Sequence, residues 1–258
     1  MKKIFLIPLF SMFALSLTGC NILRYDSFDD SKKYTIIDGS IDFTEEQLNI
    51  KKVDFDWGQG EVKVVTSDTG TLSFSETANE SLTDSLKARY YIADSTLFIK
   101  YSASKATYNN QLQKVATITI NQNLVSLAKA IYSFSVAIGE LSIESIKTSN
   151  LFASVAYGNI STKNVEATSA RFLCDRGTQT HENINLKTLG EMKSSYGDIT
   201  VQLHSSIVGF ELSTNIVGGS SLINLNRFPK SDDGFYGTKQ ESNLKLDIIE
   251  NYGELTIL

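Results

Sequence analysis

Proline, cysteine and histidine each occur only twice in the 258 residues of this chain. Two cysteines exclude a fold held together by a disulfide framework, and two histidines argue against a histidine-rich metal site. Aspartate and glutamate (29) outnumber lysine and arginine (24), so the net charge is −5, which argues against a nucleic-acid-binding protein with a basic face. A hydrophobic content of 41% excludes wholesale disorder and indicates one large folded domain or two small ones.

The N-terminal segment, residues 1–19, has the features of an export signal. Two lysines precede an apolar run from Ile4 to Leu17, which is shorter than the roughly 20 residues that a membrane-spanning helix needs. A buried N-terminal helix is the alternative interpretation. The run ends in LTGC (residues 17–20), which resembles the lipobox of bacterial lipoproteins. The resemblance implies cleavage after Gly19 and attachment of diacylglycerol to the Cys20 sulfur, often with a third acyl chain on the new amino terminus.

Three segments follow from this interpretation. Residues 1–19 are a lipoprotein signal peptide, residues 20–44 are the lipidated cysteine and a polar tether, and residues 45–258 are the folded body. Two or three acyl chains anchor a protein durably, so a membrane is the first expected partner and the cell envelope (outer membrane or cell surface) the expected location. Tyr34–Ile37 has the composition of a short strand. Cys174 is the remaining cysteine, and its strand-like context favours burial over reactivity.

Short runs rich in Val, Ile, Thr, Phe and Tyr recur after the predicted cleavage site. They are separated by Gly, Asn, Asp and Ser, which predicts an all-β body. Helical spacing of apolar residues is found only in Ser81–Lys87 and Asn123–Tyr132.

A glycine preceded by a bulky residue recurs about every 19 residues. The repeat glycines are Gly139, Gly158, Gly177, Gly197, Gly218, Gly237 and Gly253. Glycine adopts positive φ at little cost, so a corner at the same point of each coil lets successive strands stack in parallel. The repeat predicts a β-solenoid of coils of about 19 residues. An antiparallel β-sandwich is the alternative, because regular hairpins also space short strands evenly.

Four tyrosines precede repeat glycines, namely Tyr157, Tyr196, Tyr236 and Tyr252. Stacked coils would place them in one column. An exposed column would bind a glycan or a protein, because aromatic side chains supply rigid contact area. The alternative is a structural ladder packed over the corners. At the end of the chain, the apolar segment Leu255–Leu258 predicts a bare edge strand. Either residues 34–42 of the same chain would cover it, or the chain would self-associate through it.

Residues with reactive or metal-binding side chains form no recognisable catalytic motif. The sequence has no phosphate-binding loop and no nucleophile elbow, and neither His181 nor His204 has a second His or a Cys nearby. Asp232 and Asp233 lack the spacing of an EF-hand loop. Charged residues on adjacent coils leave a polysaccharide-acting enzyme as a distant alternative; they are Arg171, Asp175, Arg176, Lys193 and Asp198. We expect no enzymatic activity, no cofactor and no metal.

The repeat from Ile138 onward, including NYGELTI (residues 251–257), resembles the bacterial putative-adhesin family of β-strand-repeat proteins. The segments at 53–56 and 60–64 resemble the first strands of that family. The resemblance implies a β-solenoid-like body over residues 45–258, exported or attached to a membrane, and it supplies no catalytic residues. The expected function is that of a lipid-anchored adhesin or surface-binding module. A structural, envelope-maintenance lipoprotein without an external ligand is the main alternative.

Overall fold

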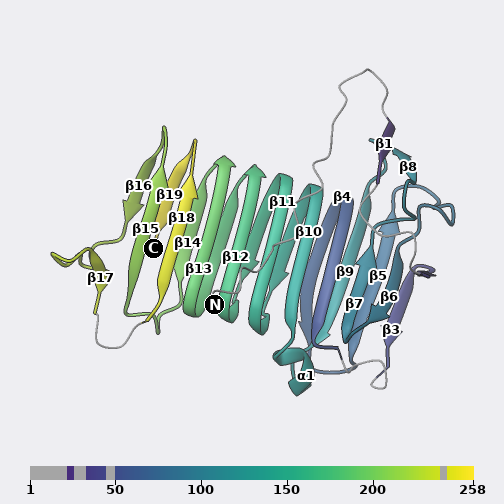
Figure 1. Ribbon diagram of the computed structural model, residues 1–258, viewed down its shortest axis with the longest axis horizontal. Helices are drawn as coiled ribbons and strands as arrows, with labels where there is room; N and C mark the ends of the chain where they lie inside the picture. Colours follow the sequence, from purple (N-terminus) through teal and green to yellow (C-terminus); the bar gives the residue numbers. More distant parts are fainter. Residues whose placement is uncertain (1–21, 26–32, 45–49, 239–242) are drawn as a thin grey trace, which may run out of the picture.

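The computed structural model describes residues 22–25, 33–44, 50–238 and 243–258 (Figure 1). Nearly all described elements are strands, and the one described helix, α1 (Val125–Ala128), has four residues. The all-β prediction is therefore confirmed. The helix expected over Ser81–Lys87 is wrong, because that segment forms a turn, and the one expected over Asn123–Tyr132 is reduced to α1.

The described strands, in chain order, are β1 (Ile22–Arg24), β2 (Thr35–Ile36), β3 (Ser40–Phe43), β4 (Lys52–Ser67), β5 (Leu72–Ala78), β6 (Arg89–Ala93), β7 (Thr96–Lys100), β8 (Thr107–Asn109), β9 (Lys114–Asn121), β10 (Ile131–Glu144), β11 (Lys147–Lys163), β12 (Glu166–Arg176), β13 (Gln179–Tyr196), β14 (Ile199–Leu203), β15 (Gly209–Ile216), β16 (Ser220–Ile223), β17 (Phe235–Gly237), β18 (Lys245–Glu250) and β19 (Glu254–Ile257). All but β1 and β8 belong to one mixed sheet.

The centre of the molecule is a stack of parallel strands. β4 pairs with β10, β10 with β11, and β11 with β12, all in parallel. Gly139 lies opposite Gly158, and Tyr157 lies opposite Arg176. Each residue therefore pairs with the residue one glycine repeat further along the chain. The offset between paired residues of the central strands equals the repeat length expected from the sequence.

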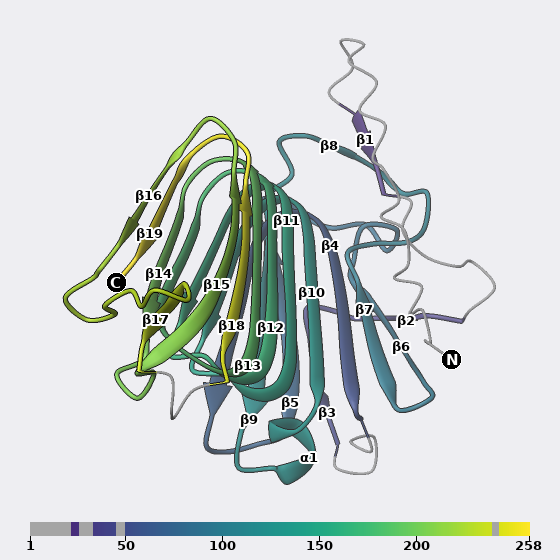
Figure 2. The same ribbon diagram turned by 60° about the vertical axis from the view of Figure 1, so that its left-hand side comes forward.

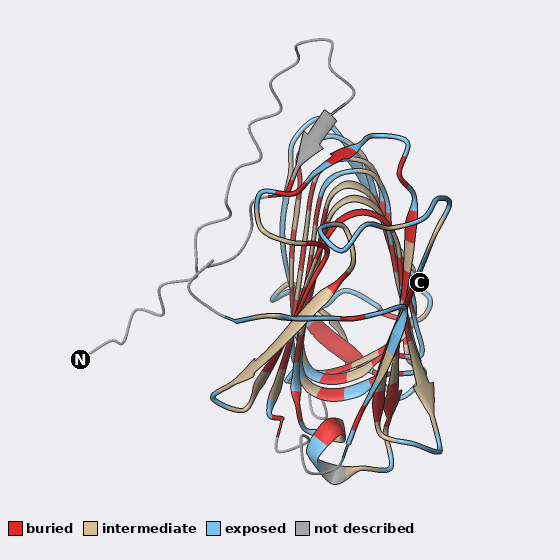
Figure 3. Cartoon of the chain, turned by 90° about the vertical axis from the view of Figure 1, so that its right-hand side faces the viewer, coloured by how far each residue is buried: buried red, intermediate tan, exposed pale blue. Residues whose placement is uncertain are grey.

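The long strands arch over at one end of the molecule, so each arch contributes to two facing walls (Figure 2). β18 and β15 continue one wall beyond β13, and β19 and β16 continue the other beyond β14. Buried residues recur along both walls (Figure 3). One inward row crosses the stack through Phe55, Phe134, Ala153, Phe172 and Met192. Burial of each large apolar side chain stabilises the fold by about 1.5–3 kcal/mol.

Glycines form the corner between the two walls. A Cβ atom added to Gly158 would lie 1.8 Å from the carbonyl oxygen of Gly139, and one added to Gly177 would lie 1.7 Å from that of Gly158. Gly197 contacts Gly177 in the same way. The expectation that Gly158, Gly177 and Gly197 stack at one corner is therefore confirmed. Gly60, which lies outside the sequence repeat, belongs to the same column, since a Cβ on Gly139 would meet its carbonyl oxygen.

A second corner at the other end of the arches uses no glycine. Ser145, Asn164 and Asn183 have φ values of 60°, 53° and 56° and recur at the spacing of the repeat glycines. Asparagine tolerates this left-handed conformation better than most residues. The Nδ2 atom of Asn183 donates a hydrogen bond to the Oδ1 atom of Asn164 at 2.6 Å, which links neighbouring coils.

The order of the coils in space differs from their order in the chain. The last segment, β18 and β19, inserts between the β13–β14 coil and the β15–β16 coil. β19 therefore has a strand on each side, and the amide of Leu258 donates to the Val201 carbonyl. The prediction that Leu255–Leu258 forms a bare edge is wrong, because a strand from an earlier coil lies on each side of this segment.

Antiparallel strands cover the opposite end of the stack. β9 pairs with β5, β7 with β6, and β3 and β2 add to β5 and β6 (Figure 1). Tyr25, Ile37 and Phe43 are buried in the core. The folded body therefore begins before residue 45, and the expected tether boundary at residue 44 is wrong. The short strand expected at Tyr34–Ile37 is present as β2. Gly19 and Cys20 lie outside the described residues.

No helix in the described part of the chain is both long and apolar enough to cross a membrane.

Candidate functional site

Three of the four predicted tyrosines lie in one column beside the glycine corner. Tyr157 lies opposite Arg176, and Arg176 lies opposite Tyr196. The Arg176 guanidinium carbon is 5.6 Å from the centre of the Tyr157 ring and 5.3 Å from that of Tyr196. The Tyr196 and Tyr252 rings stack with centroids 5.2 Å apart and planes 8° apart. These four residues are called the corner column below.

Tyr236 does not belong to the corner column, so the predicted set of four tyrosines is wrong in this member. The chain leaves the coil path after β16 and returns as β17, which pairs antiparallel with β15. There the Tyr236 ring stacks on Phe210 at 5.5 Å, and Gly237 packs against the Val208 carbonyl.

Two tyrosines of the corner column are partly covered by each other. Tyr196 and Tyr252 are 51% and 53% exposed, although their faces stack on each other. The stacking therefore covers one face of each ring and leaves about half of each residue exposed. Arg176 is exposed as well, and its guanidinium forms no ion pair with a carboxylate of the described residues. The column thus offers hydrogen-bonding groups held in fixed positions by stacking and cation–π contacts.

A second row lies on the other side of the corner. Each of its members directly follows one of the corner glycines. Its members are Glu140, Asn159, Thr178, Asp198 and Glu254, called the acidic row below. Asn159 bridges two coils, since its Nδ2 atom donates to Glu140 at 2.9 Å and its Oδ1 atom accepts from the Thr178 amide at 2.8 Å. Asp198 accepts a hydrogen bond from the Glu254 amide at 2.9 Å. The two rows together make a rigid ridge.

Glu250 lies beneath this ridge, at an inward position that apolar or small side chains occupy in other coils. It is fully buried between Ser194 and Ile216, and neither carboxylate oxygen has a hydrogen-bond partner among the described residues. Burial, followed by the negative charges of Asp198 and Glu254, raises the pKa of Glu250 to about 7. Nothing in the sequence marked this residue, because its partners lie in coils distant along the chain.

Replacing Glu250 with glutamine should remove a pH dependence of stability. A carboxyl group whose pKa is raised on folding stabilises the folded state below its unfolded pKa, and that contribution is lost as the pH rises through the folded pKa. For Glu250 the loss runs from about pH 4.5 to about pH 7 and amounts to at most about 3 kcal/mol. Urea unfolding at several pH values measures it. The exposed Glu144→Gln variant is the control, and equal pH profiles for wild type and Glu250→Gln would refute the assignment.

His181 and Cys174 are buried in the core, whereas His204 is partly exposed. His181 is 1% exposed, hydrogen-bonds to Thr162 and Gln179 at 3.0 and 3.2 Å, and burial lowers its pKa to about 3. Cys174 is buried, and burial raises the pKa of its thiol to about 11. In the described part of the chain, no group of three or more His, Cys, Asp or Glu side chains is arranged to hold a metal ion.

The five charged residues considered for an enzyme do not form one site. Arg171 and Lys193 both bind the carboxylate of Glu191, at 3.1 and 2.8 Å. Asp198 belongs to the acidic row, and Arg176 to the corner column. Ion pairs therefore account for the contacts of Arg171 and Lys193, cation–π contacts for those of Arg176, and a backbone hydrogen bond for that of Asp198.

Comparison with known proteins identifies the fold. No protein-family model matches the sequence, and no curated protein matches it. Among solved structures, the chain is similar to a putative cell adhesion protein from Clostridium sporogenes, with a TM-score of 0.58 and 15% identity, over 87% of this chain and 99% of that one. A putative adhesin from Bacteroides fragilis aligns over 88% of this chain and 98% of that one, with a TM-score of 0.47 and 15% identity. At this identity, the Clostridium structure shares the fold.

Proposed function

We propose that this protein is a lipid-anchored binding module of the cell envelope, an adhesin with a β-solenoid body. The proposal rests on the corner column, where Arg176 and the hydroxyl groups of exposed tyrosines line one ridge of a rigid stack. The parallel register, in which partners are one repeat apart, supports the solenoid interpretation over an antiparallel sandwich. The similar Clostridium structure is that of a putative cell adhesion protein, which agrees with a role in surface binding.

The protein would bind its ligand by presenting the side chains of the corner column on a rigid surface. The stacked coils fix the positions of the column side chains, so a ligand would meet them with little loss of conformational freedom. A glycan or protein ligand would accept hydrogen bonds from the Arg176 guanidinium. The tyrosine hydroxyls would both donate hydrogen bonds to the ligand and accept them from it. Diacylglycerol on Cys20 would keep this surface at the membrane. We propose no catalytic step, cofactor or metal for this function.

One observation favours a second candidate, a structural envelope protein without an external ligand. The faces of Tyr196 and Tyr252 stack on each other, as in a ladder that stabilises the corner. In that case the hydroxyl groups would have no role, and only the stacking would matter.

Two substitutions at Tyr196 separate the candidates. Tyr196→Phe keeps the stack and removes the hydroxyl, so a binding module should lose affinity by roughly tenfold, as for loss of one hydrogen bond, at unchanged stability. Tyr196→Ala also removes the stack and should cost about 1 kcal/mol of stability. Glycan and matrix arrays probed with the soluble chain from residue 21 onward identify a ligand, and titration then measures affinity. Tyr236→Phe, outside the column, is the control.

Accessibility on intact cells tests the location. Protease added outside should remove the full-length chain if it is displayed at the surface, and Cys20→Ser should release the chain from the membrane fraction. A chain that is protected on intact cells, or whose Tyr196→Phe variant shows no loss on any array, would favour the structural candidate.

A further inference from the structure

The stack ends at a strand edge that has no partner over part of its length. β15 and β16 form the last coil, and β17 pairs only with residues 209–211 of β15. Residues 212–216 of β15 and 220–223 of β16 pair on one side only within the described chain. These two segments are called the open edge below; they lie at the end of the stack remote from β3, β5 and β6 (Figure 1).

Some backbone groups of the open edge have no strand partner among the described residues. The amides of Glu211 and Val217 donate to carbonyls on the β18 side, at Leu244 and Glu250. In a parallel ladder, alternate residues face alternate neighbours, so Leu212, Thr214 and Ile216 direct their N–H and C=O groups away from β18. A further strand would find a ready-made hydrogen-bonding template there.

The side chains of the open edge do not protect it. Residues 212–226 contain no charged side chain and no proline, the two devices that usually block edge-to-edge pairing. Val217 is 49% exposed and Leu222 57% exposed. Leu212, Ile216 and Ile223 pack against the core but remain partly accessible, so the apolar interior opens at this edge.

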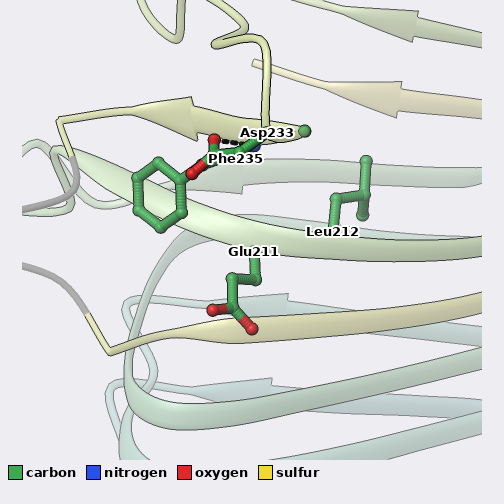
Figure 4. Close-up of a pocket in the computed structure, with 5 residues that line it drawn as sticks. Glu211, Leu212, Asp233 and Phe235 are labelled. Carbon is green, nitrogen blue, oxygen red and sulfur yellow. Dashed lines mark hydrogen bonds between the residues drawn. The ribbon is translucent and has the colours of Figure 1, made fainter.

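At this end of the stack, only the part of β15 at residues 209–211 is covered by another strand of the described chain. Phe228 is buried against Phe210, with ring centroids 5.0 Å apart, and β17 extends the sheet beside it. Where β17 stops, a pocket of about 240 Å³ opens between β15 and the turn that precedes β17 (Figure 4). Glu211, Leu212 and Phe235 line it. The pocket leaves room beside Leu212 for the end of an incoming strand.

We propose that the open edge pairs with the open edge of a second copy of this chain, antiparallel, about a twofold axis close to Thr214. The open edge is complementary to a second copy of itself, because it combines unpaired backbone groups, the absence of charge, and apolar side chains at alternate positions. Leu212 and Ile216 lie equally far from Thr214, so Leu212 of one copy would lie opposite Ile216 of the other. The pairing would join the two cores into one continuous, symmetric body.

Cysteine crosslinking of the full chain in its own membrane tests the pairing. Directly opposed residues of a hydrogen-bonded antiparallel pair have Cα atoms about 5.5 Å apart, which a disulfide spans. Thr214→Cys should therefore give an oxidant-dependent dimer of this chain. Ser161→Cys, which is exposed in the middle of the stack, should not. A Thr214→Cys chain that stays monomeric, or that links to a different protein, overturns the proposal.

Charge exchange provides a second, independent readout. Purified full-length Thr214→Lys and Thr214→Glu chains should each dimerise about tenfold more weakly than wild type, because like charges meet at the axis, and a mixture of the two should recover pairing. Thr214 is exposed, so unchanged thermal unfolding of both variants is the check on folding. If the wild-type chain is a monomer at all accessible concentrations, or the mixture recovers nothing, a second copy is not the partner.

Discussion

Gly158→Ala is expected to destabilise the protein by about 2–6 kcal/mol. The added Cβ atom would lie 1.8 Å from the Gly139 carbonyl oxygen, a backbone atom that cannot move without disturbing the next coil. Gly158 also has a φ of +133°, which side-chain-bearing residues rarely adopt. Such backbone strain costs about 1–3 kcal/mol, and overpacking adds about 1–3 kcal/mol. Urea unfolding of the soluble chain from residue 21 onward measures the loss.

Gly70→Ala is the matched control for this substitution. Gly70 also has a positive φ, +75°, but a Cβ atom there would meet nothing within 4 Å. Its replacement should cost only about 1 kcal/mol, from backbone conformation alone. If Gly158→Ala costs no more than Gly70→Ala, the close approach of neighbouring coils at the corner is refuted.

Lys114→Met is expected to destabilise the protein by about 3–5 kcal/mol, the usual cost of removing one partner of a buried ion pair. The Lys114 Nζ atom lies 2.6 Å from Glu76 Oε2, with both side chains at most 1% exposed. It also donates to the carbonyls of Leu86 and Tyr101, at 2.8 and 2.6 Å. Burial lowers the pKa of Lys114 to about 8, and the Glu76 carboxylate opposes that fall, so the ammonium is charged near pH 6. The substitution would leave the Glu76 carboxylate buried without its counter-ion.

Two comparisons make this second prediction specific. The double variant Lys114→Met/Glu76→Leu should recover much of the loss, because an apolar pair of similar volume can replace a buried ion pair at little cost. Lys52→Met removes an ion pair of similar length, 2.8 Å to Asp54, whose side chains are 39% and 26% exposed, and should cost less than about 1 kcal/mol. Equal effects of Lys114→Met and Lys52→Met on urea unfolding would contradict the structural role assigned to Lys114.

Much of the candidate site could be predicted from the sequence because it is repetitive. Regular spacing of glycine is sufficient to place Tyr157, Tyr196 and Tyr252 beside one corner, since each occupies the same step of a coil. Arg176 occupies that step as well, and its contacts with two tyrosine rings follow from the same register. Tyr236 shows the limit of this reasoning, because the same local motif lies in a segment that leaves the coil path.

The buried polar residues could not be predicted in this way. Glu76 and Lys114 are distant in the chain and meet only because β5 and β9 pair as antiparallel neighbours. Glu250 enters the core between coils that precede it in the chain. Local sequence carries no signal for either contact, since each depends on pairing between distant strands.

The all-β character, the coil length and the glycine corner were therefore determined by the sequence alone, because backbone conformation and strand alternation are local properties. Only the tertiary structure decided which coil lies beside which. It placed the final segment, β18 and β19, inside the stack and left β15 and β16 at the edge. Parallel strands pair through backbone groups that are the same in every coil, so the choice of neighbour depends on how the inward side chains of all coils pack together.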